Sequence, residues 1–169
     1  ENMAVDEESK KADSKPSNDD ELDREGKEDD RITALMRHAR AIGDTSLNDA
    51  AKMKIMQTLR DITAGKVFLE VERARVSRCM SDMLYAKGEV DKAADTLQDL
   101  AVETFGSLSR REKVEFILEQ MRLNVERTDM ARANMLSRKV NTKFFEDEEQ
   151  QSLKLLYYEL MIQIGVHDG

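Results

Sequence analysis

A single glycine between two strongly helical runs constrains this chain more than any other feature. The stretch YAKGEVDKAADTL, residues 85–97, places Gly88 between them, with Ala93 and Ala94 following five and six residues later. Glycine adopts positive φ without a Cβ clash, so Gly88 can end one helix and reverse the chain. The two alanines leave room for the second helix to pack closely against the first, where larger side chains would overpack. The stretch therefore predicts a tight helix–turn–helix.

The same arrangement recurs in register farther along the chain. Thr128 stands forty positions after Gly88, and Ala133 stands forty after Ala93. A glycine followed five residues later by alanine is typical of tetratricopeptide (TPR) helix pairs. We therefore predict an all-α chain that forms a right-handed α-solenoid of TPR-like antiparallel helix pairs, with a period of about 40 residues. Because Thr128 is not glycine, we expect its turn to close with a different geometry, and we expect a third turn at GVHDG, residues 165–169.

Periodicity and capping signals place seven helices along the chain. Only one proline occurs, Pro16, and Ser109 with Glu112 forms the S-x-x-E capping box that opens a helix. The expected helices are 31–43, 46–65, 66–87, 89–103, one opened by Ser109, one opened by Thr128, and 148–164. In three of these helices the residues expected to share one, mainly apolar, side are Leu47, Ala51, Ile55, Leu59 and Ile62; Phe68, Val71, Arg75, Cys79, Met83 and Ala86; and Met130, Ala133, Met135 and Leu136.

The charge of the chain is divided unevenly between two parts. Residues 1–30 contain thirteen acidic and five basic residues and no aromatic residue, so we interpret them as an acidic low-complexity tail or linker. Residues 31–169 are the expected helical repeat segment, with acids and bases in balance. That balance disfavours nucleic acid as a partner. No apolar run approaches the length of a membrane span, so no membrane partner is expected.

The residues that most often carry chemistry form no recognisable constellation. His38 and His167 lie far apart, Gly65-Lys66 lacks the rest of a P-loop, and Cys79 is interpreted as a structural cysteine in a reducing compartment. We expect no enzyme activity, no metal or cofactor and no small-molecule substrate. The residues expected to shape turns and packing are Gly65, Gly88, Ala93, Ala94, Gly106, Thr128 and Ala133. Phe144, Phe145, Tyr157 and Tyr158 are candidate partner contacts, with core packing as the alternative.

Four long motifs give the chain a resemblance to a known family. They are GKVFLEVERARV (65–76), GEVDKAADTLQDLAVETFGSL (88–108), VEFILEQMRL (114–123) and LSRKVNTKFFEDE (136–148). The chain resembles the PCI-family scaffold subunits of the proteasome regulatory particle lid and, more distantly, their signalosome counterparts. The resemblance implies a non-catalytic scaffold in the cytoplasm and nucleus that contacts other lid subunits in ubiquitin-dependent degradation. It also implies a C-terminal PCI domain, so we expect this chain to be a fragment truncated before that domain.

Two other functions stay open at this stage. A free TPR-like adaptor would bind peptide tails in a concave groove, and a clamp for acidic tails would concentrate Lys and Arg on the groove-facing first helices. The signalosome scaffold subunit is the related alternative within the family.

Overall fold

The computed structural model describes Ala34 and residues 48–168, and within these ranges every regular element is helical. The predicted all-α class is confirmed for this part of the chain. The acidic segment 1–30 and the expected helix 31–43, apart from Ala34, lie outside the described residues. The α-helices are α2 (Asp49–Ile62), α3 (Glu70–Ala86), α4 (Val90–Gln98), α5 (Arg110–Glu126), α6 (Met130–Ser137) and α7 (Gln151–Asp168). The short 3₁₀ helices are η2 (Val67–Leu69), η3 (Val102–Thr104), η4 (Thr142–Glu146) and η5 (Glu148–Gln150).

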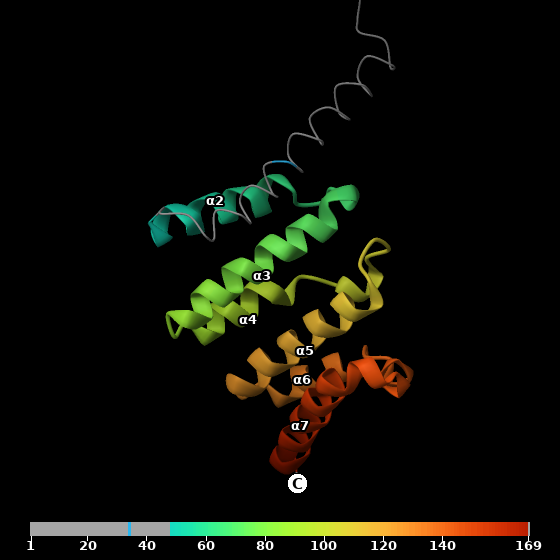
Figure 1. Cartoon of the computed structure of the whole chain (residues 1–169). Coiled ribbons are helices and arrows are strands. Elements are labelled where there is room, and N and C mark those ends of the chain that lie inside the picture. Colours follow the sequence, from blue (N-terminus) through green and yellow to red (C-terminus); the bar gives the residue numbers. More distant parts are fainter. Residues whose placement is uncertain (1–33, 35–47, 169) are drawn as a thin grey trace, which may run out of the picture.

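The helices pack in the order in which they occur in the chain. Figure 1 shows α2 to α7 arranged along one direction, with α3 beside α4 and α5 beside α6. Helix α4 also packs on α5, and α7 packs on both α5 and α6. Each element thus contacts its near neighbours in sequence, which is the contact pattern of stacked helical repeats. The right-handed sense of the solenoid stays a prediction.

Helices α3 and α5 are the first helices of the pairs α3–α4 and α5–α6, and both end in the same backbone motif. At the end of α3, the Gly88 N–H donates to the Tyr85 carbonyl over 2.8 Å, and the next N–H donates to the Leu84 carbonyl over 3.0 Å. At the end of α5, the Thr128 N–H donates to the Val125 carbonyl over 2.9 Å, and the Asp129 N–H reaches the carbonyl of residue 124 over 2.8 Å. These paired bonds define the Schellman motif.

The residues at the centres of the two motifs share a left-handed conformation. Gly88 has φ of 78° and Thr128 has φ of 65°. The expectation that the Thr128 turn closes differently is therefore wrong, because threonine takes the left-handed conformation that glycine takes in the first turn.

Small residues lie where the two helices of each pair approach each other. Ala93 and Ala133 are both 0% exposed, and Ala94 is buried. The Ser81 hydroxyl of α3 donates to the Ala93 carbonyl of α4 over 2.9 Å, which ties the two helices together. The other two glycines expected to shape turns lie in connections: Gly65 follows α2 with φ of 78°, and Gly106 lies between η3 and α5.

Caps explain several helix boundaries. Asn48 caps α2, since its side chain accepts from the Ala50 N–H over 3.0 Å, and the expected cap Ser46 lies outside the described residues. The predicted capping box of Ser109 and Glu112 is confirmed at the start of α5. Asp129 caps α6 by accepting from the Arg132 N–H over 3.1 Å.

Helix α4 ends at Gln98, before the predicted boundary at residue 103. The amide of Gln120 from α5 donates to the carbonyls of Leu97 and Leu100 over 2.7 and 3.0 Å. Gln120 is itself buried, so these bonds satisfy groups that water cannot reach. The cap at the end of α4 therefore comes from the next helix pair, and no residue near that end in the sequence predicts it.

Two other expected boundaries also require correction. The segment 66–87 begins with the 3₁₀ helix η2 rather than with α-helix. The expected turn at 165–169 is wrong as far as the chain is described, because α7 continues through Gly165 to Asp168.

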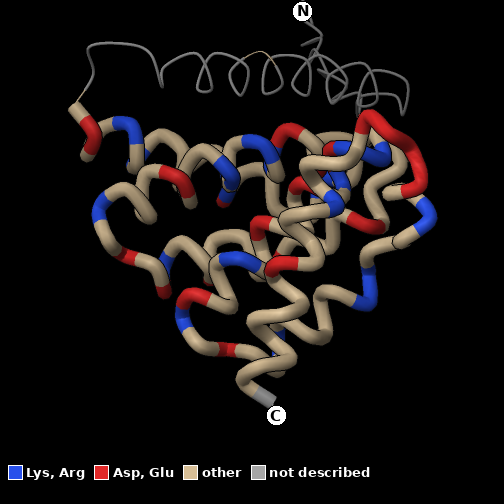
Figure 2. Tube along the Cα trace, turned by 60° about the horizontal axis from the view of Figure 1, so that its bottom comes forward, with Lys and Arg blue, Asp and Glu red and all other residues tan. Residues whose placement is uncertain are grey.

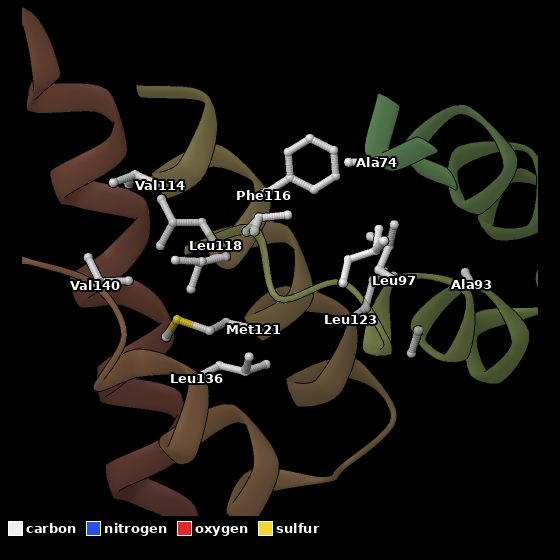
Figure 3. Close-up of a cluster of buried hydrophobic side chains, with 14 of the residues drawn as sticks. Ala74, Ala93, Leu97, Val114, Phe116, Leu118, Met121, Leu123, Leu136 and Val140 are labelled. Atoms are coloured by element: carbon white, nitrogen blue, oxygen red, sulfur yellow. The ribbon is translucent and has the colours of Figure 1, made fainter. Parts of the chain in front are cut away.

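The core runs through the stack along faces that only partly match the prediction. Phe68, which lies in η2, was expected on a buried face and is exposed, whereas Ala74, Val76 and Met80 of α3 are buried. Ile55 and Ile62 of α2 and Met135 of α6 were expected on buried faces and are exposed. Figure 3 shows core side chains of α5 extending in two directions, with Phe116 pointing toward Ala74 of α3 and Met121 toward Leu136 of α6. A central helix in a stack must bury more than one face, so one apolar stripe does not describe it.

Candidate protein-interaction surfaces

A groove of about 530 Å³ follows the first helices of the two pairs and α7, and it is crossed by paired charges. The Arg75 guanidinium of α3 binds Glu72 over 3.0 Å and Glu112 of α5 over 2.9 Å. Farther along, Arg78 of α3 lies 3.4 Å from the Glu119 carboxylate of α5. The ion pairs with Glu112 and Glu119 connect α3, the first helix of one pair, to α5, the first helix of the next.

Farther along α3 and α5, ion pairs are combined with an aromatic contact. Arg122 lies over the Tyr85 ring at 4.4 Å from its centroid, a cation–π geometry. The guanidinium also binds Glu119 over 2.7 Å and Glu126 over 2.9 Å. Tyr85 in turn donates its hydroxyl to Glu126 over 3.1 Å. Side chains of α3 and α5 therefore also contact each other directly beyond the residues that line the groove.

The ion pairs lower the pKa of two carboxyls. The hydrogen bond from Arg75 holds the pKa of Glu112 below its ordinary value. Burial would by itself raise the pKa of Glu119, but the hydrogen bond from Arg122 and the charge of Arg78 outweigh it, so the net shift is downward. Both carboxylates are thus held in the charged form.

The composition of this groove argues against a clamp for acidic tails. Arg75 and Arg78 are its only Lys or Arg residues within the described chain. Four acidic residues face them: Asp82, Glu112, Glu115 and Glu119. Cys79 lines the same groove between these charges.

The four candidate aromatic residues form one chain of ring contacts but differ in exposure. Phe145 is 2% exposed and Tyr157 is buried, with their ring centroids 5.3 Å apart. Phe144 is half-buried, and its ring contacts Phe145 edge to face. Tyr158 is 48% exposed. The two buried rings are core residues that a partner cannot reach, whereas partner contact stays a prediction for Phe144 and Tyr158.

A second hollow, of about 410 Å³, opens between α5 and the segment after α6. We call it the basic pocket. Its apolar lining consists of Val114 and Ile117 from α5 and Phe144 from η4. Its basic lining residues are Arg110, Lys113, Lys139 and Lys143. Sequence reasoning missed this site because its side chains come from separate segments and no short motif joins them.

The last helix carries an exposed apolar stripe. Leu155, Tyr158, Ile162 and Val166 of α7 are exposed and spaced by three or four residues, so they share one side of the helix. Leu160 and Ile164 of the same helix are buried. Helix α7 is therefore apolar on two sides, and its spacing in the sequence already contains this second stripe.

No side-chain arrangement for metal binding occurs in the described part of the chain. Within it, no group of three or more His, Cys, Asp and Glu side chains lies close enough to hold an ion. His38 falls outside the described residues, and His167 lies exposed on α7. The described helices also include none with the length and apolarity needed to span a bilayer. Figure 2 shows Lys and Arg interspersed with Asp and Glu over the described helices.

Comparison with known proteins gives a family match over most of the chain. The family model described as "PSMD12/CSN4, N-terminal" matches residues 23–169.

Curated relatives agree with this match. The 26S proteasome regulatory subunit rpn501 of Schizosaccharomyces pombe is 42% identical over 137 residues, which cover 81% of this chain and 31% of the relative. RPN5 of Saccharomyces cerevisiae, also called a 26S proteasome regulatory subunit, is 40% identical over 80% of this chain and 30% of its own length. Homolog A of 26S proteasome non-ATPase regulatory subunit 12 from Arabidopsis thaliana is 32% identical over 82% of this chain and 36% of its own. The chain thus spans about a third of the relatives it matches.

Proposed function

Because the chain belongs to the PSMD12/CSN4 N-terminal family, we propose that it forms the N-terminal helical segment of a proteasome regulatory subunit. In this proposal it is a non-catalytic scaffold of the regulatory particle lid and takes part in ubiquitin-dependent protein degradation through contacts with other lid subunits. The observation that carries the proposal is identity of 32–42% to three proteins named as proteasome regulatory subunits.

The architecture supports a scaffold in two ways. Stacked helix pairs present long surfaces while each pair is held by its neighbours, which suits a protein that organises partners. The exposed stripe on α7 supplies an apolar face on the last described helix, and such faces mark packing or interaction surfaces. Leu155, Ile162 and Val166 are its large aliphatic members.

The two alternative functions, a peptide-binding adaptor and a signalosome subunit, receive less support. An adaptor for acidic tails would need a basic groove on the first helices, and that groove contains more acids than bases in the described chain. The family name covers CSN4 as well as PSMD12, but the three relatives described above are named as proteasome subunits. The proteasome assignment is therefore the proposal.

The domain organisation and location remain part of the same proposal. Residues 1–30 are an acidic tail or linker, residues 31–169 are one helical repeat segment, and the full-length protein resides in the cytoplasm and nucleus. The match over residues 23–169 supports treating the helical segment as one unit.

Affinity purification of the tagged full-length protein, followed by mass spectrometry, tests the function. We expect proteasome lid subunits among the recovered proteins, and recovery of none of them would overturn the proposal. The double variant Ile162→Glu/Val166→Glu places charge on the α7 stripe and should reduce that recovery. Gln163→Glu adds a charge at an exposed position beside the stripe and should leave recovery unchanged.

A further inference from the structure

The basic pocket has more positive charge than its own surroundings neutralise. Lys139 pairs with the Glu103 carboxylate over 2.6 Å, and the Lys113 ammonium donates to the Glu103 backbone carbonyl over 3.5 Å. Arg110 and Lys143 form no ion pair with any carboxylate in the described chain. Four basic side chains therefore face one carboxylate, in a protein segment whose overall charge is balanced.

The acidic run after Phe145 does not supply the missing charge. Residues 146–149 read EDEE, yet none of them pairs with a basic residue of the pocket within the described structure. Asp147 instead accepts from the Glu149 N–H over 3.1 Å and so caps η5. The excess positive charge remains at the pocket.

The pocket combines this charge with an apolar lining. Val114 and Ile117 are buried residues of the core that reach its wall, and the half-buried Phe144 ring lies beside them. At about 410 Å³ it falls in the range of about 300–1,000 Å³ typical of ligand sites. A ligand that used the whole site would place an apolar group on the lining and negative charges at the basic residues.

We propose that the basic pocket binds an acidic segment of a partner protein that carries a bulky apolar side chain. The apolar side chain packs on Ile117 and Phe144, while flanking carboxylates face Arg110 and Lys143. Charge complementarity of this kind selects the partner and accelerates association. The inference deepens the proposed scaffold function by naming one contact surface, and it rests on that function only for the identity of the partner.

The chain's own acidic segment is a poorer occupant of this pocket. Residues 1–30 provide negative charge but contain no aromatic residue, and Leu22 is their only leucine or isoleucine. Leu22 lies between Glu21 and Asp23, but its side chain covers less of the lining of Ile117 and Phe144 than an aromatic ring does. A partner segment with an aromatic side chain between carboxylates satisfies the pocket better.

The test is fluorescence anisotropy of the complete 169-residue chain with a labelled synthetic peptide in which a central phenylalanine is flanked by glutamates. We expect saturable binding that weakens with added salt. Arg110→Glu/Lys143→Glu reverses two exposed charges and should weaken binding about tenfold or more. Lys54→Glu, at an exposed position on α2 away from the pocket, should bind like the parent.

Three outcomes would overturn the proposal. The first is equal affinity of the parent and the Arg110→Glu/Lys143→Glu variant, with circular dichroism showing both folded. The second is equal affinity for a peptide with central alanine, which would reduce the contact to unspecific charge attraction. The third is a rise in peptide affinity of about tenfold or more when the acids of residues 1–30 are changed to amides, which would make the chain's own segment the occupant.

The two proposals can fail separately. Peptide binding by the purified chain without recovery of lid subunits would remove the scaffold function and leave the pocket assignment standing. Recovery of lid subunits without peptide binding would remove the pocket assignment and leave the scaffold function standing.

Discussion

Gly88 and Thr128 occupy equivalent positions at the ends of α3 and α5, and both are left-handed, with φ of 78° and 65°. The same two backbone hydrogen bonds close both helices. For glycine this conformation costs nothing in Cβ contacts, whereas for a β-branched residue it is a genuine outlier. The second helix pair therefore forms although threonine disfavours the left-handed conformation that its turn requires.

Thr128→Gly should stabilise the chain. Removing the side chain relieves about 1 kcal/mol of backbone strain, partly offset by the greater freedom of glycine in the unfolded chain. Urea unfolding followed by circular dichroism measures the change in the free energy of unfolding. A decrease in stability would mean that the bond from the Thr128 hydroxyl to the Arg127 carbonyl, at 2.6 Å, outweighs the strain.

Gly88→Ala provides the reciprocal experiment. A Cβ built at Gly88 meets nothing within 4 Å, so the backbone conformation alone determines the cost. We expect a loss of about 1–2 kcal/mol in the free energy of unfolding. A neutral result would show that this turn tolerates a side chain as the second one does.

Ala133→Leu should destabilise the chain by about 1–3 kcal/mol through overpacking between α6 and α5. Ala133 is 0% exposed, whereas Ala131 in the same helix is exposed. Ala131→Leu is therefore the matched control and should change stability by less than about 0.5 kcal/mol. Equal effects of the two substitutions in thermal unfolding would contradict the close approach of the helix pair.

Local signals in the sequence predicted the elements better than they predicted the faces. The turn at Gly88 and the capping box at Ser109 depend on bonds between neighbours in the chain, so the sequence alone reveals them. The buried face of α3 instead includes Ser77 and Ser81, whose hydroxyls donate to the Arg73 and Ala93 carbonyls. Small polar residues can be buried when their hydroxyls are hydrogen-bonded, and a search for apolar periodicity does not detect them.

The two candidate interaction surfaces also differ in whether the sequence predicts them. The residues of the α7 stripe are spaced by three or four positions within one helix, so the stripe could be found in the sequence. The basic pocket could not, because Arg110 and Lys143 come together only through the packing of η4 on the rest of the stack. The early end of α4 has the same origin, since Gln120 of the following helix pair caps it.

Glu119→Gln should lower stability at neutral pH and lose that effect in acid. The pKa of Glu119 lies below its ordinary value of 4.5 in the folded chain, so its ion pairs contribute stability above that value. This contribution is lost as the pH falls through the lowered pKa. We expect a difference of about 1–2 kcal/mol from the parent at pH 7 that shrinks toward pH 3, measured by urea unfolding.

Glu159→Gln is the control for this pH dependence. Glu159 is an exposed carboxylate on α7 and makes no ion pair in the described chain. Its replacement should leave the difference from the parent within about 0.5 kcal/mol at every pH. A constant effect of Glu119→Gln across the pH range would show that packing, and not charge, accounts for its role.

Phe145→Ala and Tyr158→Ala should separate the core aromatic residues from the exposed ones. Phe145 is 2% exposed and packs against Tyr157, so its truncation leaves a cavity and should cost about 3–5 kcal/mol. Tyr158 is 48% exposed, and its loss should cost less than about 1 kcal/mol. Thermal unfolding of the two variants gives the comparison. Because Tyr158→Ala should keep the fold intact, it can then be introduced into the full-length protein, where reduced recovery of lid subunits would assign Tyr158 to a partner contact and unchanged recovery would exclude it.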